Sequence, residues 1–589
     1  MNSENLLSWI VFFPLVAAGI ILLIPAGFKT LIKLVGVAGA LVTFLITQSV
    51  TSRYMDADSR PSQATRGADV VLAEMTAQAL AGLEAPLAER IRQVLPVAGQ
   101  PPRVLTDAEK ASLGSGGLRE WERLAELTYA SQVPTAKTLR FVEFYEWIPG
   151  FDVNYFLAVD GLSLPLVWLT ALLGVLCLVY SWTIEKGTKA YFILFLVLET
   201  GLLGVFLALD FFLFYVFWEI VLLPMYFLIG VWGGPNRIYA AIKFFIYTLV
   251  GSVVMLLVML VMYFATEPHT FNVLALTSLC PGFSFQMQTW LFLGLFLGFA
   301  IKVPIFPFHT WLPDAHVEAP TAVSVVLAGV LLKMGGYGFF RFSYSMLPDG
   351  ALSQGMIWFI AILGMINIVY GAFCAIAQKD FKKLVAYSSV SHMGYVMLGL
   401  AAFNQAGING AALQMFNHGV SSAMLFLIVG VIYDRAHHRD LNRFGGVGLE
   451  MPWYTGVATV GFFASLGLPG LCGFIGEFLV FLGAWDRNGL ITSPSGINAA
   501  WIIYVSLLGV VLAAVYILWT IQRVYLGKPV EERRHAYHEL DFREAVALVP
   551  LAVICIAVGI FPQQTIIRHI DPSLSSMTSM VRGAADILK

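Results

Sequence analysis

Long apolar runs, separated by short polar connections, make up most of this chain. A membrane-spanning helix needs about 20 predominantly apolar residues, and fourteen runs of about that length can be picked out. The pattern therefore predicts an all-α polytopic membrane protein with about fourteen transmembrane helices. The runs have approximate centres near residues 15, 40, 171, 199, 221, 251, 299, 331, 366, 391, 421, 470, 511 and 553.

Two of the runs are interrupted by residues that break helices. The stretch GFAIKVPIFPFHTWLPDAH contains Pro304 and Pro307, and the stretch SLGLPGLCGFIGEF contains Pro469 among several glycines. Membrane helices tolerate such breaks only where protein covers the freed backbone or where it lines a cavity. Interrupted helices in corresponding halves are typical of inverted-repeat transporters. We therefore predict two inverted five-helix repeats, at residues 190–343 and 356–527, with a half-channel beside the first break.

Residues 51–149 differ from the rest of the chain. About a quarter of them are charged, with acidic and basic residues mixed, and they contain no apolar run long enough to span a membrane. The stretch DVVLAEMTAQALAGLEAPLAERIRQVL has helical periodicity, and Thr106 and Glu109 have the spacing of a capping box at a helix start. We predict a small helical insertion outside the membrane.

These features divide the chain into parts. The beginning lacks a basic region and a cleavage motif, so its first run is predicted to be a retained span rather than a signal peptide. The predicted parts are two transmembrane helices (1–50), the insertion (51–149), a third helix with its loop (150–189), the first repeat (190–343), the second repeat (356–527), and a last loop, helix and tail (528–589).

The distribution of basic residues predicts the orientation. Lys186, Lys382 and Arg439 are examples of basic residues in the loops that follow odd-numbered runs, whereas the short loops after even-numbered runs have almost none. Cytoplasmic loops of membrane proteins carry an excess of lysine and arginine. Both termini and the insertion are therefore predicted to face the periplasm, or its equivalent.

Composition agrees with a membrane protein and excludes several other classes. Of the 589 residues, 58% are hydrophobic and 12% are charged, and the mean hydropathy is +0.78, so no soluble fold could cover the apolar surface. The net charge of −2 provides no basic field for a nucleic acid. The five cysteines are spread one per apolar segment and are predicted to be packing residues rather than disulfide or cofactor ligands: Cys177, Cys280, Cys374, Cys472 and Cys555.

A few ionisable residues lie inside apolar runs. Charged groups at such depth cost at least a few kcal/mol each and usually mark ion or proton pathways. Histidine is cheaper to bury, but it can both accept and donate a proton near neutral pH. We therefore predict a proton-carrying series formed by Glu219, Lys302, Lys333, His392, His418 and Glu477.

The motifs around these residues resemble a known family. The stretches FWEIVLLPMYFLIGVWGG, AIKVPIFPFHTWLPDAHVEAPTAVSVVLAGVLLKMGGYGFFRF, AQKDFKKLVAYSSVSHMGYVMLG, MFNHGVSSAMLFLIVGVIYDR and GLPGLCGFIGEFLVFLG closely resemble the antiporter-like proton-pumping subunits of respiratory complex I, the NADH:quinone oxidoreductase. The likeness covers about residues 1–50 and 141–562. It points to the M type, because Glu477 occupies the position where the L and N types usually carry lysine, and because the chain ends soon after the last run, without the L type's long lateral helix.

The resemblance implies a role for each buried group. Glu219 and Lys302 would form a coupled pair, and Lys333 would be the central relay. His392 and His418 would bridge Lys333 to Glu477, the terminal carrier. The resemblance further implies that NADH, FMN, iron–sulfur clusters and quinone bind to partner subunits, with no cofactor in this chain, and that L-type and N-type subunits and lipid flank it in a bacterial inner membrane.

Other functions remain open from the sequence. A cation/proton antiporter of the Mrp type shares the fold and most motifs, although Glu477 argues against it. Antiporter-like subunits of membrane hydrogenases or of photosynthetic NDH complexes are closer still. A structural subunit without transport is disfavoured, because it would need neither four buried charges nor two broken helices.

Overall fold

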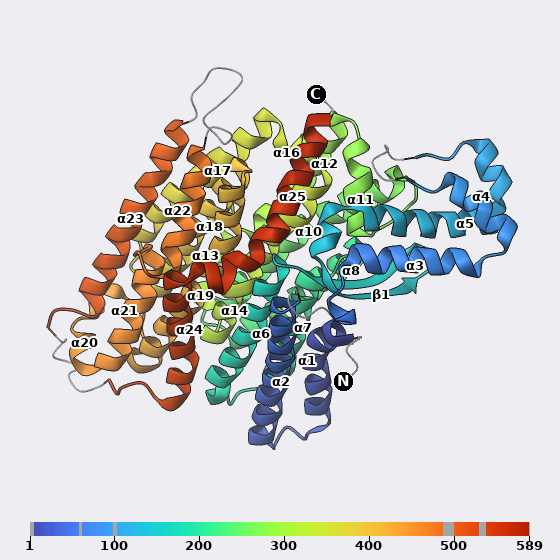
Figure 1. Cartoon of the computed structure of the whole chain (residues 1–589). Helices are drawn as coiled ribbons and strands as arrows, with labels where there is room; N and C mark the ends of the chain where they lie inside the picture. Colours follow the sequence, from blue (N-terminus) through green and yellow to red (C-terminus); the bar gives the residue numbers. More distant parts are fainter. Residues whose placement is uncertain (1–4, 58–61, 98–102, 487–499, 529–536, 588–589) are drawn as a thin grey trace.

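The computed structural model describes the whole chain except residues 1–4, 58–61, 98–102, 487–499, 529–536 and 588–589. It is a bundle of long helices from which one helical lobe extends to the side (Figure 1). Within the described ranges, twelve continuous helical segments are long and apolar enough to cross a membrane. These are α1 (Leu6–Leu23), α2 (Lys29–Met55), α6 (Ser163–Tyr180) with the turn after it, α7 (Thr188–Leu207), α8 (Phe211–Ile220) with α9 (Leu222–Trp232), α10 (Arg237–Ala265), the segment Thr321–Tyr344, α17 (Gln354–Ile376), α18 (Phe381–Ala402), α19 (Gln405–Ala436), α23 (Ala500–Val524) and α24 (Phe542–Ile560).

The twelve segments match twelve of the fourteen predicted runs, which confirms the predicted fold class. The two other runs, centred near residues 299 and 470, are the two that carry helix breakers, and the structure divides both. The first consists of α12 (Phe285–Lys302) and α13 (Trp311–Glu318), and the second of α21 (Pro452–Leu466) and α22 (Cys472–Trp485).

The segment Thr321–Tyr344 is wound irregularly. It consists of α14 (Thr321–Val326), the π-helical turn η6 (Leu327–Leu331), α15 (Leu332–Gly338) and a second π-helical turn, η7 (Phe339–Tyr344). π-helical turns are rare and frequently lie at functional sites. Every residue from 322 to 344 is buried inside the protein, so the side chains of this segment face other helices rather than lipid.

The insertion is a helical lobe that shares its core with the membrane domain. It contains α3 (Ala68–Gly82), α4 (Ala85–Val94) and α5 (Asp107–Gln132), and α5 packs along α11 (Val273–Leu279) (Figure 1). Trp121, fully buried in this core, donates a hydrogen bond to the Val94 carbonyl, 3.2 Å away. The predicted capping box is confirmed, since Thr106 and Glu109 exchange hydrogen bonds at the start of α5.

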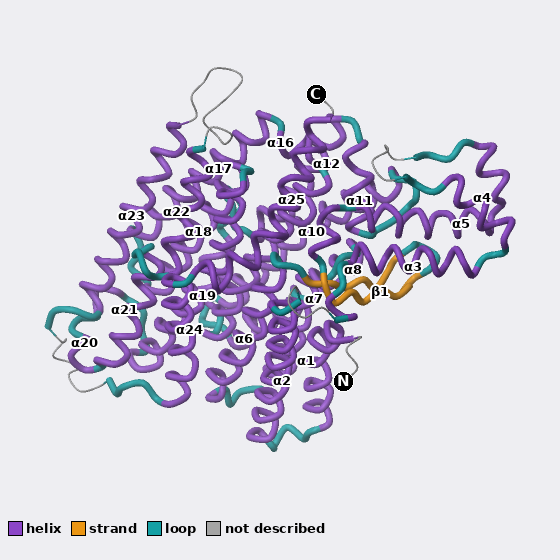
Figure 2. Tube along the Cα trace, viewed as in Figure 1, coloured by secondary structure: helices purple, strands orange, loops and turns teal. Residues whose placement is uncertain are grey.

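The predicted helical insertion at 51–149 also contains a strand, which the sequence analysis missed. The strands β1 (Arg140–Ile148) and β2 (Val153–Val159) form an antiparallel hairpin, drawn in orange in Figure 2. Its alternating aromatic and β-branched residues favour a strand. Glu143 of β1 accepts hydrogen bonds from the backbone amides of Leu7 and Ser8, which lie at the start of α1 and have no partner within that helix.

The predicted boundary at residue 50 was also wrong, because α2 continues to Met55. Its polar end stays helical since threonine hydroxyls can donate to the carbonyl four residues earlier. Thr43, Thr47 and Thr51 all do so. These side chains satisfy their own polar groups, and the helix therefore extends beyond the apolar run.

The basic loops gather on one face of the bundle. Lys29 and Lys33 form ion pairs with Glu185, at 2.9 and 2.6 Å, and Arg439 pairs with Asp380 at 3.1 Å. The insertion contacts the opposite ends of the helices, beside the start of α1. The last helix, α25 (Arg568–Ile587), lies on the insertion's face, where Ser573 accepts a hydrogen bond from Gly161. The side of the membrane on which each face lies stays a prediction.

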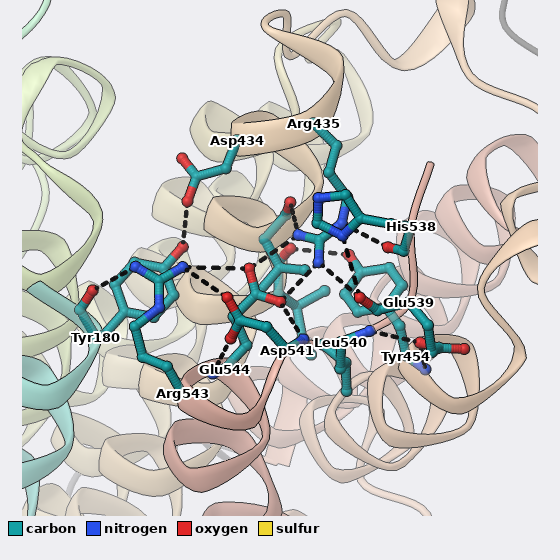
Figure 3. Close-up of polar contacts among 12 residues, drawn as sticks. Tyr180, Asp434, Arg435, Tyr454, His538, Glu539, Leu540, Asp541, Arg543 and Glu544 are labelled. Carbon is teal, nitrogen blue, oxygen red and sulfur yellow. Dashed lines mark hydrogen bonds and ion pairs between the residues drawn. The ribbon is translucent and has the colours of Figure 1, made fainter. Parts of the chain in front are cut away.

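A buried ion pair and the hydrogen bonds around it connect the ends of three helices, α19, α24 and α6, on the basic face (Figure 3). Arg435, at the end of α19, donates to both carboxylate oxygens of Glu544 in α24, at 2.9 and 2.7 Å, and only 2% of each side chain is exposed. Arg543 donates to the carbonyl of Tyr180, the last residue of α6. Tyr180 in turn donates to Asp434, beside Arg435. Breaking such a pair would leave a buried charge without a partner.

We expect Arg435→Met to destabilise the protein by about 3–5 kcal/mol, because Glu544 would remain buried and unpaired. Thermal unfolding of the purified assembly in detergent measures the effect. Lys29→Met is the matched control: it removes an ion pair in which both side chains are about half exposed, and solvent-exposed pairs contribute little. Equal melting temperatures for the two variants would contradict the structural role of the Arg435–Glu544 pair.

Candidate proton-carrying site

Side chains form hydrogen bonds with the backbone groups at the first helix break. Asn367 of α17 accepts a hydrogen bond from the Phe306 amide, at 2.7 Å, and donates one to the Pro304 carbonyl, at 3.2 Å. Trp311 donates to the Ile301 carbonyl across the break, at 2.9 Å. Backbone groups freed by a break inside a membrane must find partners within the protein. The segment between α12 and α13 therefore has a defined conformation.

Lys302 ends α12 at this break. It is completely buried, and its ammonium group has no hydrogen-bonding partner among the described residues. Instead the ammonium lies 5.2 Å from the centre of the Trp218 ring and 5.5 Å from that of Phe244. Aromatic faces attract cations, and more strongly when water is excluded. The rings therefore hold the charge in place without taking its proton.

Glu219 adjoins Trp218 in α8. The carboxylate is close enough to Lys302 to interact with it electrostatically, but its buried oxygen Oε1 has no hydrogen-bonding partner within the described chain. Glu219 and Lys302, the predicted coupled pair, thus lie near each other, but no hydrogen bond joins their charged groups in this structure.

The other four predicted residues form a connected series. Lys333, in α15, donates a hydrogen bond to the Ala328 carbonyl in the π-helical turn η6, and its Nζ lies 2.8 Å from Nδ1 of His418, within hydrogen-bonding distance. The rings of His418 and His392 have their centres 5.7 Å apart. Three helices, α15, α19 and α18, therefore bring one lysine and two histidines together in the buried interior.

Glu477 completes the series at the second helix break. Its Oε1 lies 3.3 Å from Nδ1 of His392, and Nε2 of the same ring lies 3.1 Å from the Ser465 hydroxyl. The break itself turns at Gly467, whose φ of +82° is strained for residues with a side chain. Asn417 of α19 donates to the Cys472 carbonyl at 2.5 Å, so an asparagine contacts the start of α22 beside this break.

The two groups meet where α12 packs against α15. A Cβ atom on Gly335 would lie 3.0 Å from Cβ of Lys302 and 2.7 Å from the Phe299 carbonyl. Glycine thus allows the end of α12 to lie directly against the helix that carries Lys333. The structure brings all six predicted residues into two adjoining clusters.

Four further buried groups were missed in the prediction. Among the described residues, neither carboxylate oxygen of Glu199 in α7 has a hydrogen-bonding partner. The same holds for both ring nitrogens of His309 and of His316. His316 stacks on Phe426 and lies within electrostatic reach of Lys333 and Lys382. An acid within an apolar run was the available signal for Glu199, as it was for Glu219.

Lys382 was assigned to a loop and is instead buried. It lies in the first turn of α18, is 5% exposed, and donates to the Ala319 carbonyl at 2.5 Å. Its neighbours Lys379 and Lys383 are the kind of residues that mark a loop, so the sequence alone offered no means to separate it from them. Among the described residues, no cluster of three His, Cys, Asp or Glu side chains is placed to hold a metal ion, and the five cysteines are free.

The sequence profile of the family described as "NADH:quinone oxidoreductase/Mrp antiporter, TM" matches residues 208–502. The chain belongs to this family. It is 45% identical over 457 residues to NADH-quinone oxidoreductase subunit M of Rhodobacter capsulatus, an alignment that covers 75% of this chain and 85% of that relative. It is 41% identical over 430 residues to NAD(P)H-quinone oxidoreductase chain 4 3 of Trichormus variabilis, covering 73% of this chain and 79% of the other.

The solved structures agree with the family assignment. A chain from respiratory complex I of Thermus thermophilus matches with a TM-score of 0.75 at 26% identity, covering 98% of this chain and 99% of that one. The recognised likeness to M-type antiporter-like subunits of complex I is therefore confirmed. This family member is a multi-pass membrane protein.

Proposed function

We propose that this chain carries protons across the membrane through Glu219, Lys302, Lys333, His418, His392 and Glu477, as the M-type subunit of an NADH:quinone oxidoreductase. The observation that carries the proposal is the contact series from Lys333 to Glu477, which runs through the interior between two broken helices. Each member can bind and release a proton, and each lies beside the next. A purely structural core would not need such a series.

Separation of charges supplies the drive in this scheme. When Glu219 approaches Lys302, the carboxylate stabilises the ammonium. When the two move apart, burial favours the neutral amine, so Lys302 releases its proton towards Lys333. Lys333 already lies within hydrogen-bonding distance of His418. A histidine can accept a proton at one ring nitrogen and release one from the other. Protonation of His392 then favours ionised Glu477 beside it.

The energy for this movement comes from other subunits. In the proposed assembly, NADH, FMN, iron–sulfur clusters and quinone bind to partner chains, and this chain contains no redox site of its own. L-type and N-type antiporter-like subunits flank it in the bacterial inner membrane, with lipid covering the rest of its apolar surface. The concentration of basic loops on one face supports placing that face in the cytoplasm.

The orientation predicts that the insertion is accessible from the periplasm. Protease added to right-side-out vesicles should cut the lobe around Arg119 and Arg123, which line an open cavity on α5, or a tag placed in the lobe should be exposed there. Inverted vesicles provide the control for leakage. Cleavage or tag exposure in inverted vesicles alone would overturn the orientation.

Glu477 is expected to act through its charge. Glu477→Gln keeps the size of the side chain but cannot ionise beside His392, so proton pumping and quinone-linked NADH oxidation should both fall. Glu477→Asp keeps the carboxylate and should retain part of both activities. Glu74→Gln, on the exposed surface of the insertion, is the control for the substitution itself. Full pumping by Glu477→Gln would exclude the proposed role.

Lys302 provides the sharpest test, because arginine keeps the charge but cannot pass a proton on. Lys302→Arg and Lys302→Met should both assemble, yet both should pump far less, with NADH oxidation by an upstream artificial acceptor near normal. Native gels report assembly, and proton uptake by inverted vesicles reports pumping. Lys29→Arg, on the exposed basic face, is the matched control. If Lys302 were only a counter-ion, Lys302→Arg would pump fully and Lys302→Met would fail to assemble.

A further inference from the structure

The insertion is fastened to the membrane domain by two buried carboxylates. Glu126 of α5 is 5% exposed, and its Oε1 accepts hydrogen bonds from the side-chain amides of Asn154 and Asn272, each 3.0 Å away. Asp210 is completely buried at the start of α8, where it accepts from the amides of Leu213 and Asn154, again at 3.0 Å. Asn154 therefore contacts both acids, one with its side chain and one with its backbone.

Neither acid forms an ion pair with a lysine or arginine in the part of the chain that the structure describes. Their hydrogen bonds come from amides: the side chains of Asn154 and Asn272 for Glu126, and backbone N–H groups for Asp210. Two like charges close together in a buried site cannot both stay ionised at low cost. The site is therefore most stable when it holds a proton.

A cavity connects this buried site with the aqueous phase. It has a volume of about 380 Å³, and Glu126 and Asn154 form part of its lining. From α3 only Met75 reaches it. The charged and titratable groups around it or facing it are Arg119, Glu120, Glu122 and Arg123 of α5, Glu146 of β1, Asp152 of the hairpin turn, and Glu267 and His269 before α11.

That outer ring carries charges of both signs. Burial raises the pKa of Asp152 above its ordinary value, Arg119 and His269 act to lower it, and Glu146 acts to raise it. The ring can therefore balance its own charge over a range of pH. The buried pair has no such balance within hydrogen-bonding distance, because its partners there are the side-chain amides of Asn154 and Asn272 and backbone amides.

We infer that Glu126 and Asp210 form a proton-binding site that makes the attachment of the insertion depend on the acidity of the aqueous phase around it. The proton is taken up from the cavity and neutralises one acid of the pair. Loss of the proton leaves two carboxylates facing each other across Asn154, between the lobe and the start of α8. Nothing in this inference requires the proposed pumping path.

The direction of the pH dependence follows from the two carboxyl groups. Burial, above all, raises the pKa of Glu126 from its ordinary value of 4.5 to about 8, and that of Asp210 from 3.8 to about 7. In a detached lobe Glu126 is hydrated and ionises near its ordinary value. Attachment is therefore strongest below about pH 4.5 and weakens as the pH rises towards about 8, where the buried acid gives up its proton.

Hydrogen exchange of the intact complex tests the inference. Protection of the α5 backbone over residues 118–132, relative to the intrinsic exchange rate at each pH, should fall between pH 5.5 and 8.5. The steepest fall expected for one proton is about tenfold per pH unit. A helix remote from the lobe, α19, reports any general loosening of the complex over the same range.

Glu126→Gln is the decisive variant. Its amide oxygen can still accept from Asn154 and Asn272, but the side chain stays neutral at every pH, so protection should be higher and should depend less on pH, with Asp210 as the remaining titrating group of the pair. Glu120→Gln, on the same helix and beside the same cavity, is the matched control and should retain the wild-type dependence. An unchanged pH dependence in Glu126→Gln, or a flat profile in the unaltered protein, would overturn the inference.

Asp210→Asn keeps the inference testable if Glu126→Gln does not fold. Asparagine is as good a helix cap as aspartate, so the start of α8 should form. Removing the second acid lowers the pKa of Glu126, and the pH dependence of protection should become shallower than in the unaltered protein. A dependence as steep as before would exclude a shared site.

Discussion

Every polar group placed inside a bilayer must find its partner within the protein, and the two broken helices depend on this requirement. Each break frees backbone groups at the depth where charged side chains are also placed. Asn367 bonds to two backbone groups within the first break, and Asn417 donates to the Cys472 carbonyl beside the second. With the backbone satisfied in this way, the helix ends can stay open towards Lys302 and Glu477, and the proposed path can pass between the repeats.

Much of the membrane domain could be predicted from the sequence, because its dominant signal is apolar length. Twelve runs became continuous spans, and the two runs with helix breakers became divided helices. The hairpin of β1 and β2 was missed, since its residues follow a charged, helix-forming stretch and its pairing depends on contacts with α1. The end of α2 was placed too early for a related reason: Thr51 satisfies its own hydroxyl within the helix, so polarity there does not signal a loop.

The candidate site was predictable as a set of residues but not as an arrangement. Buried acids, lysines and histidines stand out in apolar runs, and all six lie in the interior or at its margin. In the structure Lys333 contacts His418, and Lys302 lies over the ring of Trp218 without a hydrogen bond to Glu219. Both arrangements depend on packing between helices that are distant in sequence. Lys382 shows the opposite limit, since its sequence context does not differ from that of the nearby, exposed Lys379.

The glycine face of α15 has a consequence for how such a protein can vary. At Gly335 the spacing between two proton-carrying helices is set by a missing methyl group: the backbone of α12 fills the space that a Cβ would need. Alanine there would push the two helices apart, although it adds no charge and is a better helix former. The tolerance of this position to substitution is thus governed by the approach of α12 to the helix that carries Lys333, and a scan of helix stability alone would misjudge it.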